Sequence, residues 1–294
     1  MVKFKSTTEV LKIIKNKEQI RNFSVIAHVD HGKTTMSDSL LAASGIIAPS
    51  AAGKALAMDF DKEEQARGIT IYQANVTLHF TQKDKEYVIN MIDTPGHVDF
   101  SGRVIRSLRA IDGATVVCDA VEGIMTQTET VTRMALEERV RPVLFINKVD
   151  RLIKELRLTP EKMQETLAGV VTSFNQLIDT YAEPEYKEKW KVSIQDASVT
   201  FGSAKDKWAF NVDIMKEKGI TFKDVIDAYK NEKVDDLVAR APLADAVLGM
   251  VVKHVPPPNV AQKYRIPQIW KGDLESDIGK ALLECSDDGP TIMM

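Results

Sequence analysis

The sequence has few cysteines, no long apolar run and almost no net charge, and each of these absences excludes a class of protein. The two cysteines, Cys118 and Cys285, are too few for a disulfide framework or a cysteine-rich zinc site. No apolar stretch is long enough to span a bilayer, and residues 1–8 lack the apolar run of a signal peptide. The formal net charge of −3 does not indicate a nucleic-acid partner recognised through bulk charge. We therefore expect a cytoplasmic protein with no membrane partner.

What is present indicates a globular α/β protein. The 294 residues suffice for one large domain or two ordinary ones, and the composition of 44% apolar and 28% charged residues is that of a protein with a real core. The strands expected from apolar runs are 23–27, 69–80, 87–92, 113–121, 141–146 and 199–201. The helices expected from apolar spacing are 9–18, 35–43, 98–110, 126–138, 159–181 and 243–255. This alternation predicts a mostly parallel sheet with helices on both faces.

The domain organisation follows from where this alternation stops. We expect an N-terminal helix in 1–20, a core in 21–205 and a small inserted subdomain with two helices in 206–241. A closing helix is expected in 242–262. Residues 263–294 are expected to form an extended linker followed by the truncated start of a strand-rich, β-barrel-like domain. Residues 183–191 read as a charged loop. At helix starts, Thr126 with Glu129 predicts a capping box, and Thr159 before Pro160 predicts an N-cap.

A phosphate-binding loop is predicted between the first strand and the helix after it, where the sequence reads Ala27-His28-Val29-Asp30-His31-Gly32-Lys33-Thr34. Its backbone N–H groups and the helix N-terminus would face an anion. Lys33 would reach the β- and γ-phosphates, and the Thr34 hydroxyl would bind Mg²⁺. Ala27 departs from the glycine that usually opens this pattern, and a chance Gly-Lys-Thr turn is the alternative.

Three further polar motifs, 93–97, 147–150 and 202–205, also follow strand ends, so that one ligand could touch all of them. In the first, Asp93 can hold Mg²⁺ directly or through water, and Gly96 can turn a backbone N–H toward the γ-phosphate. The alternative is an ordinary Thr-Pro-Gly turn. His97, directly after it, can orient an attacking water.

The motif Asn147-Lys148-x-Asp150 is typical of a guanine reader. The Asp150 carboxylate can accept two N–H bonds from guanine, a pattern that adenine does not offer. Asn147 can bond either the N7 edge of the base or the phosphate loop, and the Lys148 stem can cover the ring. The alternative is a polar exit from a strand. In Ser203-Ala204-Lys205, a backbone N–H would complete the pocket at guanine O6.

The long loop 45–68 ends in Arg67-Gly68-Ile69-Thr70. Thr70 can give Mg²⁺ a second hydroxyl while γ-phosphate is present, and loss of that phosphate would release the loop. Without the other motifs, a glycine turn that starts a strand would be the better explanation.

Together these motifs resemble the translational GTPases, in their archaeal elongation-factor form; the short insertion after Lys205 has the archaeal character. The resemblance implies a P-loop GTPase domain that binds GTP or GDP with Mg²⁺ and powers the ribosomal movement of tRNA and mRNA. It implies His97 and Lys33 as catalytic residues, and Thr34, Thr70 and, through water, Asp93 at the metal. The GTP-binding residues that it implies are His28, Val29, Asp30, His31, Gly32, Lys33, Thr34, Thr35, Thr70, Asp93, Gly96, Asn147, Lys148, Asp150, Ser203, Ala204 and Lys205.

The resemblance also implies partners. These are the GTPase-activating region of the large ribosomal subunit and the C-terminal tail of the stalk protein, with tRNA and mRNA contacted only by further domains; we expect a monomer. Two alternatives remain: a ribosome-assembly GTPase with the same domain, and a scaffold that holds GTP without hydrolysis. An ATP-driven enzyme is disfavoured by Asp150, which suits guanine.

Overall fold

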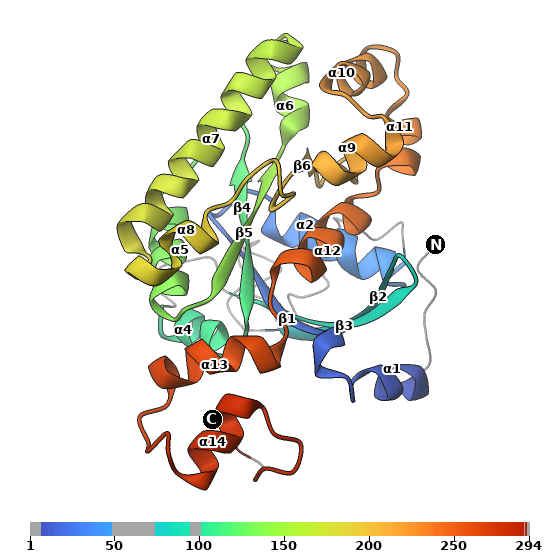
Figure 1. The fold of residues 1–294 in the computed structure, drawn as a ribbon. Helices are drawn as coiled ribbons and strands as arrows, with labels where there is room; N and C mark the ends of the chain where they lie inside the picture. The colour runs from blue at the N-terminus through green and yellow to red at the C-terminus, as the bar shows by residue number, and fades with distance from the viewer. Residues whose placement is uncertain (1–6, 49–73, 95–100, 291, 293–294) are drawn as a thin grey trace.

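A seven-stranded sheet lies at the centre of the chain in a computed structural model that describes residues 7–48, 74–94, 101–290 and 292 (Figure 1). The strands are β1 (Ile20–Ala27), β2 (Ala74–Gln82), β3 (Lys85–Asp93), β4 (Gly113–Asp119), β5 (Arg141–Asn147), β6 (Val199–Ser203) and β7 (Trp208–Phe210). Their order is β2-β3-β1-β4-β5-β6-β7, in which the five inner strands are parallel and the edge strands β2 and β7 antiparallel. The predicted mostly parallel sheet is confirmed.

The helices cover both faces of the sheet (Figure 1). They are α1 (Thr7–Ile13), the 3₁₀ turn η1 (Lys17–Gln19), α2 (Lys33–Ala43), α4 (Ser101–Arg109), α5 (Thr126–Glu137), α6 (Val149–Lys154), α7 (Pro160–Tyr181), α8 (Pro184–Trp190), α9 (Val212–Lys218), α10 (Phe222–Lys230), α11 (Val234–Arg240), α12 (Leu243–His254), α13 (Pro258–Ile269) and α14 (Asp277–Glu284). One face packs against α2 and α12, and the other against α4, α5 and α7. None of these described helices combines the length and apolar character needed to cross a bilayer.

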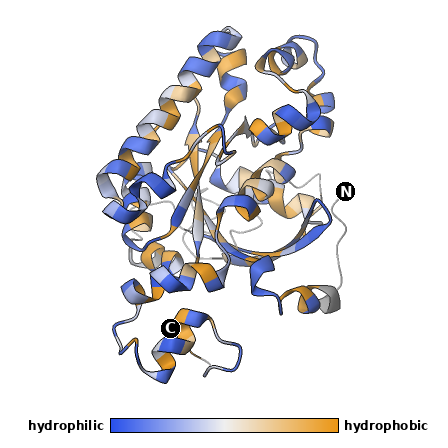
Figure 2. Ribbon diagram, viewed as in Figure 1, coloured by the Kyte–Doolittle hydropathy of each residue, from blue (hydrophilic) through white to orange (hydrophobic). Residues whose placement is uncertain are grey.

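The central strands are apolar because they are buried on both faces. In β4, Ala114, Val116 and Cys118 point into one core and Val117 into the other, and none is exposed. Helix α10 is amphipathic and buries only Phe222, Val225 and Ile226, whereas α12 is apolar over most of its length (Figure 2). Burial of both faces explains why the strands read as continuous apolar runs rather than as alternating ones.

The predicted insertion 206–241 is not separate from the main sheet. It begins with β7, which the sequence does not predict and which pairs with β6. Trp208 in β7 is fully buried, and its Nε1 donates to the Tyr229 hydroxyl at 2.7 Å. The two helices expected in this segment are present as α10 and α11, and the Trp208–Tyr229 bond joins α10 to the sheet edge.

Three local predictions are wrong. The charged loop at 183–191 is the helix α8, because Pro184 starts it and Tyr186 stacks on Trp190 at 4.4 Å. The segment expected to be an extended linker is helical as far as Ile269, where α13 ends, and the segment expected to be strand-rich holds the helix α14, which Ser276 caps.

The capping predictions have opposite outcomes. Thr159 caps α7 as predicted, accepting from the Lys162 N–H at 3.4 Å. The Thr126 capping box is wrong, because Met125 occupies the N-cap position of α5, without a side-chain capping bond, and Thr126 already lies inside the first turn. Glu129 instead accepts a hydrogen bond from the Tyr181 hydroxyl at 2.6 Å, which joins α5 to α7.

A buried ion pair holds α13 to the sheet. Arg265, with 5% of its side chain exposed, lies 3.4 Å from Asp112 Oδ1 and donates to the Leu108 carbonyl at 2.7 Å. The other Asp112 oxygen accepts from Asn22 at 2.8 Å. Burial raises the pKa of Asp112, although the Arg265 charge opposes this rise. Each charge of this buried pair therefore needs the other, because either one alone would be buried without a counter-ion.

Arg265→Met is expected to lower the free energy of unfolding by about 3 kcal/mol, because it leaves Asp112 buried without its cation. The matched control is Arg109→Met, which breaks an ion pair with Glu138 in which the arginine is 45% exposed and should cost less than ~1 kcal/mol. Urea denaturation of both variants measures the two losses. Equal losses would contradict a structural role of the buried pair.

Candidate functional site

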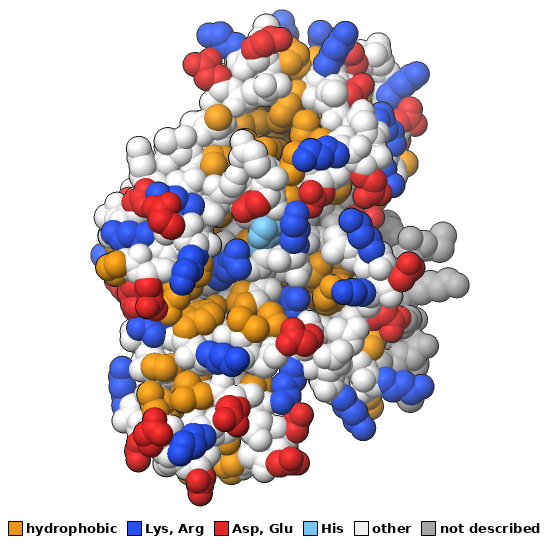
Figure 3. Space-filling view, viewed as in Figure 1, with side chains coloured by type: hydrophobic (Ala, Val, Ile, Leu, Met, Phe, Trp, Pro, Cys, Tyr) orange, Lys and Arg blue, Asp and Glu red, His pale blue; other side chains and the backbone are white. Residues whose placement is uncertain are grey.

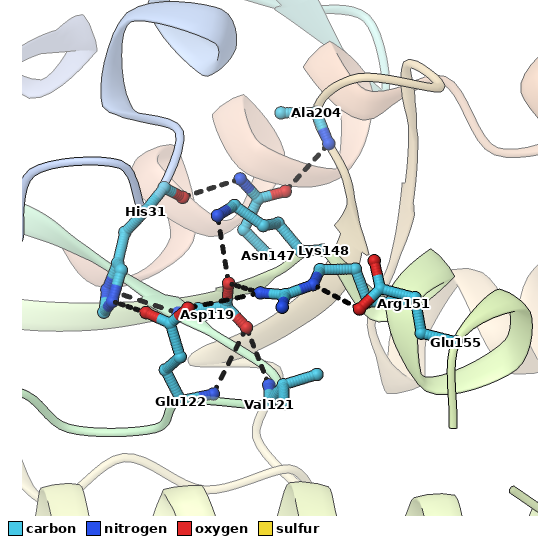
Figure 4. Close-up of polar contacts among 9 residues, drawn as sticks. All are labelled: His31, Asp119, Val121, Glu122, Asn147, Lys148, Arg151, Glu155 and Ala204. Carbon is cyan, nitrogen blue, oxygen red and sulfur yellow. Dashed lines mark hydrogen bonds and ion pairs between the residues drawn. The ribbon is translucent and has the colours of Figure 1, made fainter. Parts of the chain in front are cut away.

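Three of the predicted motifs meet at one edge of the sheet, beyond the carboxyl ends of β1, β5 and β6. Asn147 connects them: its Nδ2 donates to the His31 carbonyl at 2.8 Å, and its Oδ1 accepts from the Ala204 N–H at 2.8 Å (Figure 4). The amide of Asn147 is buried, so both bonds are shielded from water. Of the two uses proposed for Asn147, the structure shows the bond to the phosphate loop.

The phosphate loop turns sharply between β1 and α2. Gly32 is the N-cap of α2 and has a left-handed backbone with φ of 93°. A Cβ at this position would lie 2.3 Å from Asn147 Nδ2, so only glycine fits. Because glycine has no capping side chain, the N–H groups of the first turn of α2 are left to an anion. Thr34 and Thr35 lie half-buried in that turn.

Lys33 and Asp93 form the charged centre of this edge. Lys33 Nζ lies 2.9 and 3.0 Å from the two Asp93 carboxylate oxygens and 2.7 Å from the Thr94 carbonyl. Both side chains are buried, and the strands that precede them are neighbours, with Val25 of β1 paired to Asp93 of β3. A lysine cation at the start of α2 and a fixed carboxylate at the end of β3 suit a ligand that carries both phosphate and a metal ion.

The donor atoms here fit Mg²⁺. Asp93 offers a carboxylate and Thr34 a hydroxyl, and hard oxygen ligands are those that Mg²⁺ prefers. One or two protein ligands suffice for this ion when phosphates and waters complete its shell.

The remaining loop residues differ in exposure. Asp30 is exposed with φ of 69°, the Val29 N–H donates to Gln127 at 3.4 Å, and the half-buried His28 meets the His31 ring edge-on at 4.9 Å. His31 is fully buried and its Nδ1 accepts from the Asp119 N–H at 3.3 Å. Burial lowers the pKa of His31 and nearby His28 lowers it further, although the Asp119 and Glu122 charges oppose this.

The guanine motif lies at the junction between the end of β5 and the start of α6. Lys148 has a left-handed backbone with φ of 58°, and its Nζ lies 3.0 Å from Asp119 Oδ2. Asp150 is buried in the first turn of α6, 3.7 Å from Lys154. In the neighbouring loop Ser203 accepts from the Asp206 N–H at 3.2 Å, and Lys205 is exposed.

Asp119 is not among the predicted site residues, although it contacts two residues of the guanine-motif loop. Its buried carboxylate bonds Lys148 and, at 2.7 Å, Arg151 (Figure 4). Burial alone would raise the pKa of Asp119, but hydrogen bonds from the Val121 N–H and from Lys148 outweigh burial and lower it. Asp119 is the polar last residue of the apolar strand β4, as Asp93 and Asn147 are of β3 and β5, and that position was the available signal.

Three predicted site residues, Thr70, Gly96 and His97, lie outside the described residues, as does most of the loop 45–68. The remaining predicted residues belong to the strand ends, loops and helix starts around Asn147 and Lys33. The edge therefore carries a phosphate-type site and a base-type site side by side, joined by the Asn147 amide.

Comparison with known proteins gives close relatives. A model of the elongation factor Tu GTP binding domain family matches residues 18–257. Elongation factor 2 of Cenarchaeum symbiosum (strain A) is 89% identical over 294 residues, which is 100% of this chain and 40% of that protein. Elongation factor 2 of Saccharolobus islandicus (strain L.S.2.15) and that of Staphylothermus marinus are each 57% identical, again over 100% of this chain and 40% of theirs. The chain thus spans about 40% of the length of these curated relatives.

Proposed function

The chain belongs to the elongation factor Tu GTP-binding domain family, and from this premise we propose that it binds and hydrolyses GTP on the ribosome to power the movement of tRNA and mRNA. The relatives that match it along its whole length carry the name elongation factor 2. Such a role would place the chain in the cytoplasm with the ribosomes.

The observation that carries this proposal is the pair of hydrogen bonds made by the Asn147 amide. They hold the Gly-Lys-Thr loop, the Asn-Lys-x-Asp loop and the Ser-Ala-Lys loop against one another. A ligand with phosphates at one end and a base at the other fits such an arrangement, and Asp150 selects guanine.

The roles follow from the positions. Lys33 and the N-terminus of α2 bind the phosphates, and Thr34 with Asp93 would hold Mg²⁺, which when bound neutralises charge on the β- and γ-phosphates. To reach a phosphate, Lys33 exchanges its present contacts with Asp93 and Thr94 for phosphate oxygens. Thr70 is proposed as a second metal ligand, Gly96 as a γ-phosphate contact and His97 as the residue that orients the attacking water.

The proposed partners are ribosomal. The GTPase-activating region of the large subunit would stimulate hydrolysis, and the C-terminal tail of the stalk protein would dock on the inserted helices α9 to α11. Basic and acidic side chains are interspersed over the face shown in Figure 3, which is compatible with a monomer that contacts RNA mainly through other domains.

The test is GTP turnover with and without archaeal ribosomes. Such activators raise the rate on the order of 10³–10⁵-fold in other GTPases, and a large ribosome-dependent rise is the expected result. Retained GTP without any rise would instead favour the non-hydrolysing scaffold or a ribosome-assembly GTPase.

Asp150→Asn is expected to lower the affinity for GTP about 100-fold and to raise that for xanthosine triphosphate, because an amide can donate to the xanthine oxygen but accepts poorly from guanine. Competition of both nucleotides against a fluorescent GDP measures the change. Asp206→Asn is the matched control, since Asp206 also pairs with Lys154 but lies outside the motif. Unchanged competition in Asp150→Asn would contradict the guanine assignment.

A further inference from the structure

We propose that Asp119 is a positioning residue for nucleotide binding, which holds Lys148 where its stem covers the guanine base. The inference rests on the proposed function, because it concerns the same site. It assigns a role to a carboxylate outside the Gly-Lys-Thr, Asp-Thr-Pro-Gly and Asn-Lys-x-Asp motifs.

The first step is the position of Asp119 relative to Lys148. Asp119 is the last residue of β4 and pairs with Asn147 at the end of β5, so its side chain lies directly beside the residue that precedes Lys148. The Asp119 side chain has no exposed surface, whereas that of Lys148 is 27% exposed, and the two meet at 3.0 Å. A fixed, buried anion thus anchors the tip of a partly exposed lysine (Figure 4).

The second step is the rigidity of this carboxylate. Its Oδ1 accepts from the Val121 N–H at 2.7 Å and from the Glu122 N–H at 3.3 Å, which fixes its plane. Its Oδ2 is shared by Lys148 and Arg151, and Arg151 is itself held by Glu155 at 3.0 Å. An anion that is held by backbone donors on one oxygen can direct a cation on the other.

The third step is the connection to the phosphate loop. The Asp119 N–H donates to His31 Nδ1 at 3.3 Å, and the next residue, Ala120, donates to the Asn147 carbonyl at 2.8 Å. The end of β4 therefore contacts both the phosphate side and the base side of the site. A substitution of the Asp119 side chain leaves these backbone bonds in place. It changes only the contacts on the base side of the site, where Asp119 meets Lys148.

The experiment is release of fluorescent GDP from the 294-residue chain, measured by stopped flow with excess unlabelled GDP. Asp119→Asn keeps the shape but removes the charge, and we expect release about tenfold faster, the effect of losing one charged hydrogen bond. Asp119→Asn should also speed the release of inosine diphosphate, which lacks the 2-amino group, by the same factor relative to the parent chain. The reason is that Asp150, which contacts the 2-amino group, is unchanged.

A double-mutant cycle separates positioning from a merely structural role. In a Lys148→Ala background, Asp119→Asn should change release by less than about twofold, because its target is already absent. Glu155→Gln is the matched control: it removes a carboxylate from the same network without touching Lys148, and it should release GDP at the parental rate.

The outcomes distinguish this inference from the proposed function. A parent chain that does not retain GDP overturns both. A parent that retains GDP while Asp119→Asn releases it at the parental rate overturns the positioning role alone. The same is true if Asp119→Asn accelerates release tenfold in the Lys148→Ala background.

Discussion

Gly32→Ala is expected to lower the affinity for GDP roughly 1000-fold, close to a complete loss of binding. The φ of 93° at Gly32 costs an L-residue about 1–2 kcal/mol. The added Cβ would lie 2.3 Å from Asn147 Nδ2, so the Asn147 amide must also move. Its displacement breaks the bonds to His31 and Ala204, each worth about 1 kcal/mol, and separates the phosphate side from the base side.

Fluorescence titration with labelled GDP measures this loss, and circular dichroism shows whether the variant folds. Gly219→Ala is the matched control, because Gly219 has φ of 61°, lies at the C-terminal end of α9 away from the site, and would have no atom within 4 Å of an added Cβ. Gly219→Ala shares with Gly32→Ala the free-energy cost of a left-handed backbone, but its added Cβ meets no other atom. If Gly32→Ala bound GDP as tightly as Gly219→Ala, the contact with Asn147 would have no importance for the site.

The position of the site could be predicted from the sequence because the strands that lead to it are short, apolar and buried. Parallel strands bring their carboxyl ends to one edge, so a polar residue directly after such a strand is placed by topology alone. Asp93 and Asn147 are the polar last residues of β3 and β5, and both lie at that edge. Gly32 follows from the motif, but its close approach to Asn147 depends on a residue 115 positions later, a separation along the sequence that local patterns do not report.

The parts that could not be predicted depend on partners far away in the sequence. In α13 the buried residues include Arg265, and a buried arginine is stable only with Asp112, which lies 153 positions earlier. A search for an apolar stripe therefore misses this helix. Likewise β7 has three residues and is defined by its pairing with β6, not by its own pattern. Asp119 resembles any polar strand exit until Lys148 and Arg151 are placed beside it.

His97→Ala is expected to lower the ribosome-stimulated rate of GTP hydrolysis at least about 1000-fold, which is the lower end of the acceleration that such activators supply. His97 itself lies outside the described residues, but a nearby residue is fixed: Lys33 Nζ bonds the Thr94 carbonyl at 2.7 Å.

The measurement is single-turnover hydrolysis on archaeal ribosomes, together with the affinity for labelled GDP. His97→Gln should retain part of the stimulated rate, because an amide can also orient a water. The matched control His79→Ala removes a histidine from β2, beside Glu86, and should hydrolyse GTP at the parental rate.

The distribution of the effect between rate and affinity decides what His97 does. A residue that orients the attacking water acts on the transition state and not on the bound nucleotide, so the rate should fall while the affinity for GTP stays within about twofold. A parallel fall of both would make His97 a binding residue. An unchanged rate on ribosomes would remove it from the reaction and leave the Lys33 side of the site to supply the catalysis.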